Sequence, residues 1–436
     1  MHEIIIAKGE GVMSKKMRYY LSIFSLSVGG SSIWLLVYVR YVFYDQMIAT
    51  MGITNTQLGL LTTFSSVVGL CLLPIKGYVS DRCDSKRVII VSIASTSALA
   101  FFFGCFTTYT VAVIVWSLMG VTTGLGYWQS LIKFLNGLGE PEEAGRSFSL
   151  YYGIYGVVAA LVNVVEVWAG GKFGFHGAVF VISGINALAA VMDIFLLDGD
   201  RDKIKRGEMP APVVTEENKV RISDIRYVVK WPGTYILGLS GFFTYMLYAN
   251  VSYFNPYLVN VMGVSPEISS TLSVIRTYFL MLVCPIGGII ADKIFKSTAK
   301  AFILMFSVSA LLFAVVFLFK PGMNMWVAAI YSLVPSLVVM PLYSISNSLI
   351  REMHIPPMIL GTVIAISGIT GTLVDMVPPA LYGHWLDKYG NAGYNMIFLS
   401  LIVVCFGGVL TGLLAIRHDQ KCKAGKRKMY IGEGRG

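Results

Sequence analysis

Two arginines lie inside apolar runs that are long enough to cross a membrane, where a charged side chain must find a partner. Arg276, in VIRTYFLMLVCP, lies about 13 Å below the outer end of its run at the helical rise per residue. A guanidinium stays charged and can bind a carboxylate, phosphate or sulfonate through two hydrogen bonds. We therefore predict that Arg276 binds an anion near the membrane midplane; a fixed internal ion pair is the alternative.

Arg40 is a second cation of this kind. It lies in WLLVYVRYVFYDQM, closer to the outer end of its run. It could bind the same anion, or its long side chain could reach the membrane surface. Tyr38 and Tyr41 fall at helical spacing beside it and are candidate substrate contacts, with packing as the alternative. Two asparagines in later apolar runs, Asn250 and Asn347, add uncharged hydrogen-bonding groups.

Two acids in apolar runs are candidates for proton coupling. Asp375 lies in GTLVDMVPP, and Glu166 lies a few residues from the outer end of its run. A carboxyl group in an apolar environment can exchange a proton near neutral pH. Asp375 could equally be a fixed partner of Arg276. Asp193 lies close to an inner end, where a structural role is favoured.

The composition excludes most other classes of protein. Of 436 residues, 56% are apolar and 13% are charged, which is too few charges to coat a soluble enzyme. Long unbroken apolar runs do not fit an outer-membrane barrel. The five histidines are scattered, and no nucleotide-binding or hydrolase motif is present. We expect no enzyme activity, no cofactor, no metal site and no nucleic-acid partner, although the net charge is +10.

The apolar runs predict twelve membrane-spanning helices in an all-α protein. The spans are 19–46, 57–79, 88–107, 110–132, 147–169, 177–197, 234–260, 267–291, 300–319, 325–350, 359–383 and 394–416. The polar stretch 198–233 separates two six-helix bundles, 19–197 and 234–416. An N-terminal segment, 1–18, and a basic tail, 417–436, flank them.

The basic residues predict the orientation of these spans. With the N-terminus inside, 29 of the 34 Lys and Arg residues fall in cytoplasmic segments or at inner helix ends. Such an excess is typical of cytoplasmic loops. We therefore expect a multi-pass protein of the inner (plasma) membrane with both termini in the cytoplasm, and we expect a monomer.

The two halves of the chain repeat one another at an offset of 211 residues. Matches spread over about 30 residues without a gap, which favours two homologous bundles, as in many transporters. The matching positions are Met51-Gly52 with Met262-Gly263, Pro74-Ile75 with Pro285-Ile286, Gly77 with Gly288, and Asp81-Arg82 with Asp292-Lys293.

The segment GYVSDRCDSKR resembles the loop signature of the major facilitator superfamily, and GIIADK resembles a second copy of it. Both copies fall where that family carries them, between spans two and three and between spans eight and nine. The resemblance implies a conformational latch on the cytoplasmic side. Its members here would be Gly77, Asp81, Arg82, Lys86 and Arg87, with Gly288, Asp292 and Lys293 in the second copy.

The sequence departs from the family patterns at three places, and two of these departures bear on the kind of transport. Asp84 stands where the loop signature has its second glycine, and Gly120 stands where proton-linked members often have an arginine. Span five also lacks the Gly-Pro motif of drug antiporters. The missing arginine and the missing Gly-Pro motif disfavour multidrug efflux, and the missing arginine also weakens the case for proton coupling; Asp84 bears on the loop geometry alone.

The leading hypothesis is secondary active transport of a small organic anion by alternating access, coupled to protons. One alternative is transport of a neutral solute such as a sugar, with the charges paired internally. Another is a membrane sensor that has the same fold and moves nothing. The lipid bilayer, a small-molecule substrate and a coupling ion are the expected partners.

Overall fold

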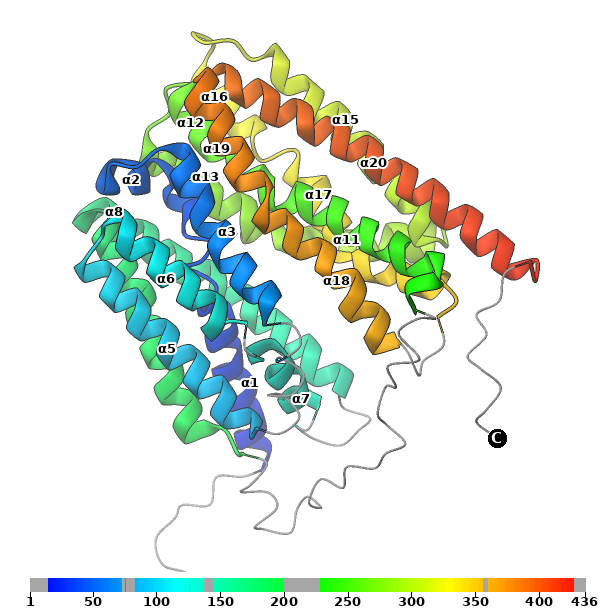
Figure 1. Cartoon of the computed structure of the whole chain (residues 1–436), viewed down its shortest axis with the longest axis horizontal. Helices are drawn as coiled ribbons and strands as arrows, with labels where there is room; N and C mark the ends of the chain where they lie inside the picture. The colour runs from blue at the N-terminus through cyan, green and yellow to red at the C-terminus, as the bar shows by residue number, and fades with distance from the viewer. Residues whose placement is uncertain are drawn as a thin grey trace, which may run out of the picture.

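The computed structural model describes residues 15–72, 75, 83–124, 126–136, 138, 144–199, 228–355 and 360–426. Every regular element in these residues is a helix, and the helices form two bundles that lie side by side (Figure 1). This arrangement confirms the all-α prediction. We call the end where α1 begins and α20 ends the near end. The opposite end, where α2 meets α12 and the start of α3 meets α19, is the far end (Figure 1).

The N-terminal bundle is built from seven described helices. They are α1 (Lys15–Ser32), α2 (Arg40–Met51), α3 (Asn55–Cys71), α5 (Ser85–Cys105), α6 (Tyr109–Thr122), α7 (Tyr127–Asn136) and α8 (Ala144–Leu196). The predicted linker 198–233 lies largely outside the described residues, and α11 resumes the fold at Pro232.

The C-terminal bundle has more, shorter helices. They are α11 (Pro232–Asn250), η3 (Val251–Tyr253), α12 (Phe254–Asn260), α13 (Pro266–Thr277), η4 (Phe279–Val283), α14 (Cys284–Ile289), η5 (Ile290–Ile294), α15 (Thr298–Val315), η6 (Val316–Leu318), α16 (Met325–Tyr331), α17 (Ser336–Ser344), η7 (Ser346–Glu352), α18 (Leu360–Met376), α19 (Pro378–Tyr389) and α20 (Ala392–Lys423).

Seven helical stretches in the described part of the chain are long and apolar enough to cross a membrane. One of them, Leu150–Leu196, covers the predicted spans five and six. Predicted spans one, two, seven and eleven are not among the seven, because their described helices are shorter or more polar. Interrupted helices are common in transporters, where the breaks lie at the bundle interface.

Polar caps explain where several helices begin. Thr54 and Gln57 form a reciprocal capping box at the start of α3. Asp84 accepts a hydrogen bond from the backbone N–H of Lys86 at 3.1 Å and caps α5. Ser265 caps α13. The aspartate that departs from the family signature therefore has a local structural role, because it satisfies an N–H group that the first helical turn leaves unpaired.

A single glycine separates spans five and six. The chain from 144 to 196 is helical except at Gly174, where φ is 70° and ψ is −175°. A positive φ favours glycine because it has no Cβ. Both arms return to α1: the Ser27 hydroxyl donates to the Tyr151 carbonyl at 3.1 Å, and Ser25 donates to Asp193 at 2.5 Å. The predicted loop at 170–176 is therefore a tight reversal centred on Gly174.

The hydrophobic core shows which ends of the bundles meet. One cluster of buried residues contains members of both bundles, among them Met47, Leu61 and Tyr253. A second cluster contains residues of the N-terminal bundle alone and occupies its near half, around Ile89 and Leu131. The two bundles therefore share a core toward the far end and have separate cores toward the near end.

Candidate functional site

A carboxyl group held by two tyrosines lies between the bundles. Asp375, on α18, accepts a hydrogen bond from the Tyr38 hydroxyl at 2.9 Å and from the Tyr245 hydroxyl at 2.8 Å. The two hydroxyl oxygens lie 3.1 Å apart. Tyr38 comes from the turns between α1 and α2, and Tyr245 comes from α11. Asp375 is 8% exposed, and its Oδ1 atom has no hydrogen-bond partner among the described residues.

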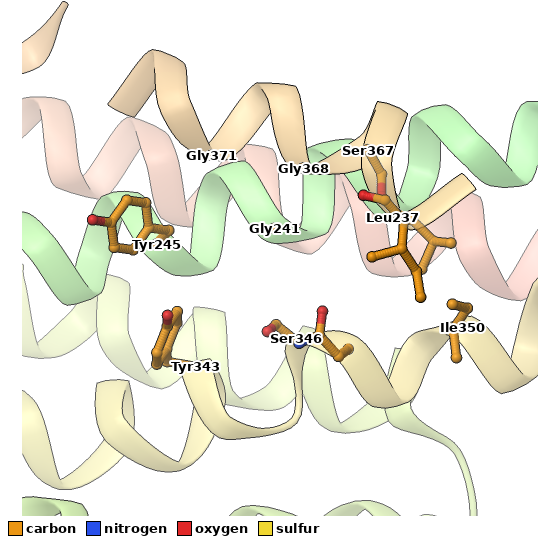
Figure 2. A pocket seen from close by; sticks show the side chains of 11 residues that line it. Leu237, Gly241, Tyr245, Tyr343, Ser346, Ile350, Ser367, Gly368 and Gly371 are labelled. Carbon is orange, nitrogen blue, oxygen red and sulfur yellow. The ribbon is translucent and has the colours of Figure 1, made fainter. Parts of the chain in front are cut away.

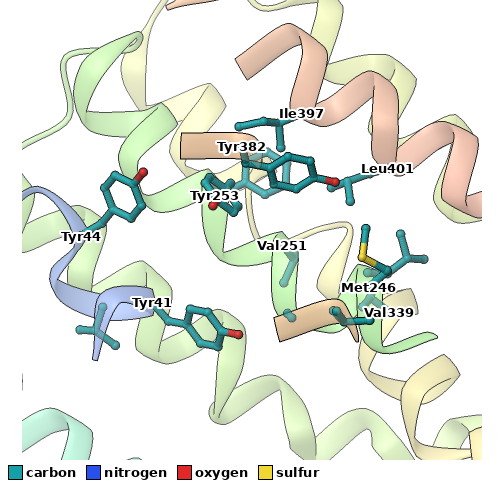
Figure 3. Close-up of a cluster of buried hydrophobic side chains, with 14 of the residues drawn as sticks. Tyr41, Tyr44, Met246, Val251, Tyr253, Val339, Tyr382, Ile397 and Leu401 are labelled. Carbon is teal, nitrogen blue, oxygen red and sulfur yellow. The ribbon is translucent and has the colours of Figure 1, made fainter. Parts of the chain in front are cut away.

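Arg40 lies beside this group, at the start of α2. Its side chain is 3% exposed, so it does not reach the membrane surface, and that sequence-based alternative is wrong. Its guanidinium packs over the Tyr41 ring, 5.1 Å from the centroid, and donates to the Tyr253 hydroxyl at 3.4 Å. Figure 3 shows Tyr41 and Tyr253, from opposite bundles, in this aromatic cluster.

The charge of Arg40 has no fixed counter-ion in the described part of the chain. No carboxylate oxygen there lies within 4.0 Å of the guanidinium. Its Nε atom is buried and makes no hydrogen bond with those residues. Asp375 acts on Arg40 only from beyond ion-pair distance. A buried cation in this condition, between the two bundles, is a candidate site for an anion from outside the protein.

A cavity of about 270 Å³ lies in the near half of the C-terminal bundle (Figure 2). Its wall includes Asn347 and a row of glycines on facing helices, Gly241, Gly368 and Gly371, which leave room for a solute. Tyr245 and Tyr343 lie at one end of the cavity, as Figure 2 shows. Tyr245 therefore connects the two features, because it lines the cavity and its hydroxyl donates to Asp375.

Arg276 lies away from this cavity, inside the C-terminal bundle. It is fully buried, packs 5.5 Å from the centroid of the Phe254 ring and donates to the Ser332 hydroxyl at 3.3 Å. Its Nε and Nη1 atoms have no partner among the described residues. Asp375 does not pair with Arg276 in this structure, because its described hydrogen bonds are to Tyr38 and Tyr245.

The remaining polar candidates are divided between the two bundles. Glu166, on α8, is 2% exposed and lies in electrostatic range of Tyr278 on the opposite bundle. Its Oε1 atom has no hydrogen-bond partner in the described part of the chain. Asn250 donates to the Met246 carbonyl at 2.9 Å within its own helix and does not line the cavity, whereas Asn347 does.

The first copy of the predicted latch lies mostly outside the described residues. Gly77, Asp81 and Arg82 are not described, so their latch role stays a prediction. Lys86 and Arg87 belong to the first turn of α5, at the near end of the N-terminal bundle.

The second copy pairs within its own bundle. Asp292, in η5, accepts a hydrogen bond from Arg351 of η7 at 3.2 Å, and both side chains are well exposed. Such a pair contributes little to stability. Lys293 is exposed, and Gly288 has open space beside it. The close helix contact is made by the neighbouring Gly287, where a Cβ atom would collide with the Pro341 carbonyl oxygen.

Another carboxylate joins the two bundles at the far end. Asp387, near the end of α19, accepts hydrogen bonds from the backbone N–H groups of Asn55 and Thr56 at 2.9 and 2.8 Å. The side chains of the same two residues donate at 2.8 and 2.5 Å. The first residues of α3 are thus capped by the opposite bundle. Gly59 and Gly383 permit this contact, because a Cβ atom on either would collide with a backbone oxygen of the other bundle.

These contacts predict the effect of Asp387→Ala. Burial raises the pKa of Asp387, but hydrogen bonds from Thr56 and Asn55 outweigh this effect and hold the pKa below its ordinary value. The stability that these hydrogen bonds contribute is therefore fully present at a pH above the ordinary pKa of an aspartate. It is lost as the pH falls through the lowered pKa of Asp387. We expect Asp387→Ala to shift the population toward a far-open state by roughly fivefold. Accessibility of a cysteine placed at Leu58, which is buried on the same helix and leaves the contacts of Asp387 intact, measures this shift.

Glu267→Ala is the matched control, because Glu267 is an exposed acid at the same end, in the first turn of α13. It should leave accessibility unchanged. Equal labelling in the two alanine variants would show that Asp387 does not hold the far end closed.

Sequence reasoning did not single out four of these residues: Tyr245, Tyr253, Tyr343 and Asp387. A weak signal was available for two of them, since Tyr245 and Tyr253 lie on the apolar run FFTYMLYANVSYF at intervals that return to one helical face. Asp387 looks like an ordinary loop acid in the sequence. Its role depends on a helix start 332 residues earlier in the chain.

Comparison with known proteins assigns the family. The family model described as Major Facilitator Superfamily matches residues 20–379, which is most of the chain. The chain belongs to the Major Facilitator Superfamily. The family predicted from the two loop signatures is thereby confirmed. The protein is a membrane transporter and not an enzyme.

Curated relatives of the chain include bacterial membrane proteins. Inner membrane protein YihN of Escherichia coli is 25% identical over 406 residues, which cover 91% of this chain and 95% of that protein. A probable hexose phosphate transport protein of Chlamydia muridarum is 25% identical over 292 residues, covering 61% of this chain and 62% of that protein.

Solved structures share the fold. A bacterial homologue of the human lysosomal transporter Spinster, in an inward-facing and unoccupied conformation, aligns with a TM-score of 0.71 and 16% identity. The alignment covers 95% of this chain and 99% of that one. A mutant form of the nucleoside transporter NupG aligns with a TM-score of 0.67 and 15% identity, covering 93% of this chain and 99% of that one.

Proposed function

We propose that this transporter moves a small organic anion by alternating access and couples its movement to protons. The observation that carries the proposal is Arg40. Its guanidinium is buried between the two bundles, with no carboxylate within ion-pair distance in the described residues. A bound anion would supply the missing negative charge and could accept a hydrogen bond from the unpaired Nε–H group of Arg40.

A phosphate ester is the substrate class that we favour. The chlamydial relative is a probable hexose phosphate transport protein, and a phosphate presents two oxygens to a guanidinium. The cavity beside Tyr245 and Tyr343 would hold the uncharged part of the molecule. Tyr38 and Tyr41 would contact the substrate between Arg40 and the cavity, and Asn347 would donate from the cavity wall. Arg276 and Asn250 remain candidate ligands for another state of the cycle.

Asp375 is the favoured coupling residue, with Glu166 as the second candidate. Asp375 is a buried carboxyl group at the bundle interface, and its Oδ1 atom is free of hydrogen bonds within the described chain. A proton can therefore bind there while Oδ2 keeps its two tyrosine donors. Glu166 also lies where α8 faces the C-terminal bundle, and its Oε1 atom is likewise free of hydrogen bonds within the described residues. It ranks second because, within those residues, no hydrogen bond joins its carboxyl group to the other bundle, as Tyr38 joins Asp375.

We propose that the protein is a monomer in the inner membrane, and that both of its termini lie in the cytoplasm. The orientation rests on the 29 Lys and Arg residues of the cytoplasmic segments. In this orientation the far end is the outer end. The closed far end and the near-half cavity then correspond to a state that faces the cytoplasm.

Uptake into proteoliposomes tests the function. We expect glucose 6-phosphate and related phosphate esters to compete with one another, and a proton gradient to drive their accumulation. Preference for an uncharged sugar over every carboxylate, phosphate and sulfonate would favour the neutral-solute alternative. No flux of any of these solutes would favour the membrane sensor, which makes no use of a pathway across the membrane.

A further inference from the structure

The hydrogen bonds to Asp375 connect two different pairs of helices. Tyr245 and Asp375 belong to one bundle, where α11 and α18 pack together and the Thr370 hydroxyl donates to the Gly238 carbonyl at 2.7 Å. Tyr38 belongs to the other bundle. The Tyr245–Asp375 contact is thus internal to a bundle, whereas the Tyr38–Asp375 contact crosses the interface.

Alternating access affects these two contacts differently. The bundles rock against each other largely as rigid bodies around the central site. Rocking preserves the distance from Tyr245 to Asp375 but separates Tyr38 from Asp375. The carboxyl group therefore has two tyrosine donors in the state described here and one in the opposite state.

We propose that Tyr38 is a positioning residue that ties the protonation of Asp375 to the conformation of the two bundles. The inference rests on the proposed role of Asp375 in proton coupling and deepens it. In the far-closed state Tyr38 donates to the carboxylate, and the proton leaves toward the near end. When the bundles rock, the carboxylate loses that donor, and a proton from the far side compensates.

The surroundings of Asp375 favour this role for Tyr38. The titratable and charged groups that face the carboxyl group come from three segments. Among them, Tyr38 is the residue of the N-terminal bundle that makes a hydrogen bond to Asp375. The set is Tyr38, Arg40 and Tyr41 from 33–51, Tyr245 from α11 and Tyr343 from α17. Both donors bind Oδ2, so proton binding at Oδ1 does not require either to leave.

Tyr38→Phe tests the inference because it removes the donor and keeps the ring that stacks on Tyr41. We expect proton-driven accumulation of glucose 6-phosphate, measured relative to exchange in the same vesicles, to fall about fivefold, the value of one hydrogen bond. Accumulation should recover when the pH on the near side is raised by about one unit. A higher pH favours release of the proton from Asp375, which the Tyr38 hydrogen bond favours in the unmodified protein.

Tyr248→Phe is the matched control. Tyr248 lies on the same helix as Tyr245, stacks 4.4 Å from the Tyr343 ring and makes no hydrogen bond through its hydroxyl with the described residues. It should leave both accumulation and its pH profile unchanged. A pH profile of Tyr38→Phe that coincides with that of Tyr248→Phe would overturn the proposed role of Tyr38.

An infrared titration gives a test that needs no substrate. The C=O band of a protonated carboxyl group that disappears in Asp375→Asn reports this residue directly. In Tyr38→Phe we expect the band to persist to a pH at least half a unit more alkaline. An unchanged midpoint in Tyr38→Phe would reject the role of Tyr38 alone. If Asp375→Asn retained proton-driven accumulation, the coupling role of Asp375 itself would be wrong.

Discussion

Arg40→Gln is expected to lower the affinity for a phosphate ester by about 100-fold, which is typical for removing one partner of a desolvated charge pair. Glutamine keeps some hydrogen-bonding capacity but loses the charge that a buried anion requires. Arg40→Lys should lose roughly tenfold, because a lysine keeps the charge without the planar pair of donors. Competition binding to purified protein measures both values.

Arg276→Gln provides the comparison for Arg40, because its guanidinium is also buried but lies inside one bundle against Phe254 and Ser332. Removing it eliminates a buried charge that has no carboxylate partner within the described chain, so thermal stability should hold or rise. Affinity should change less than in Arg40→Gln. A larger loss of affinity in Arg276→Gln than in Arg40→Gln would show that the anion binds inside the C-terminal bundle instead.

Asp375→Asn is expected to abolish proton-driven accumulation, with a loss of at least about 100-fold, while exchange of substrate persists. The physical reason is that the amide is nearly the same size and still accepts hydrogen bonds from Tyr38 and Tyr245 but cannot bind a proton. Measuring accumulation and exchange in the same vesicles separates coupling from binding.

Glu166→Gln tests the second acid in the same assay. If Asp375 carries the proton, Glu166→Gln should retain accumulation, because Glu166 lies where α8 faces Tyr278, outside the hydrogen-bonded set around Asp375. Loss of accumulation in Glu166→Gln with normal behaviour of Asp375→Asn would assign coupling to Glu166 instead.

Much of the architecture could be predicted from the sequence. Apolar runs located the helices, because a membrane span must be apolar over about 20 residues. The repeat at an offset of 211 residues predicted two related bundles, and the loop signatures predicted the family. Buried charge could also be predicted, since Arg276 and Asp375 stood out as ionisable groups within apolar runs; for Arg40 the sequence left open a position at the membrane surface.

The partners of those charges could not be predicted. Periodicity shows that a residue is buried in a helix, but it does not show which helix covers it. Arg276 and Arg40 looked alike in the sequence, yet one packs inside a bundle and the other between bundles. The difference depends on contacts with residues far away in the chain: Tyr253 for Arg40 and Ser332 for Arg276.

The sequence by itself therefore determined the helices, the family and the presence of buried charge, because these depend on local composition and spacing. The tertiary structure decided that Tyr38, 337 residues from Asp375 in the chain, shares its carboxyl group with Tyr245. It also decided that Asp387 caps a helix of the other bundle. A hydrogen bond requires two atoms within about 3 Å, and only the packing of the two bundles brings residues so far apart in sequence to that distance.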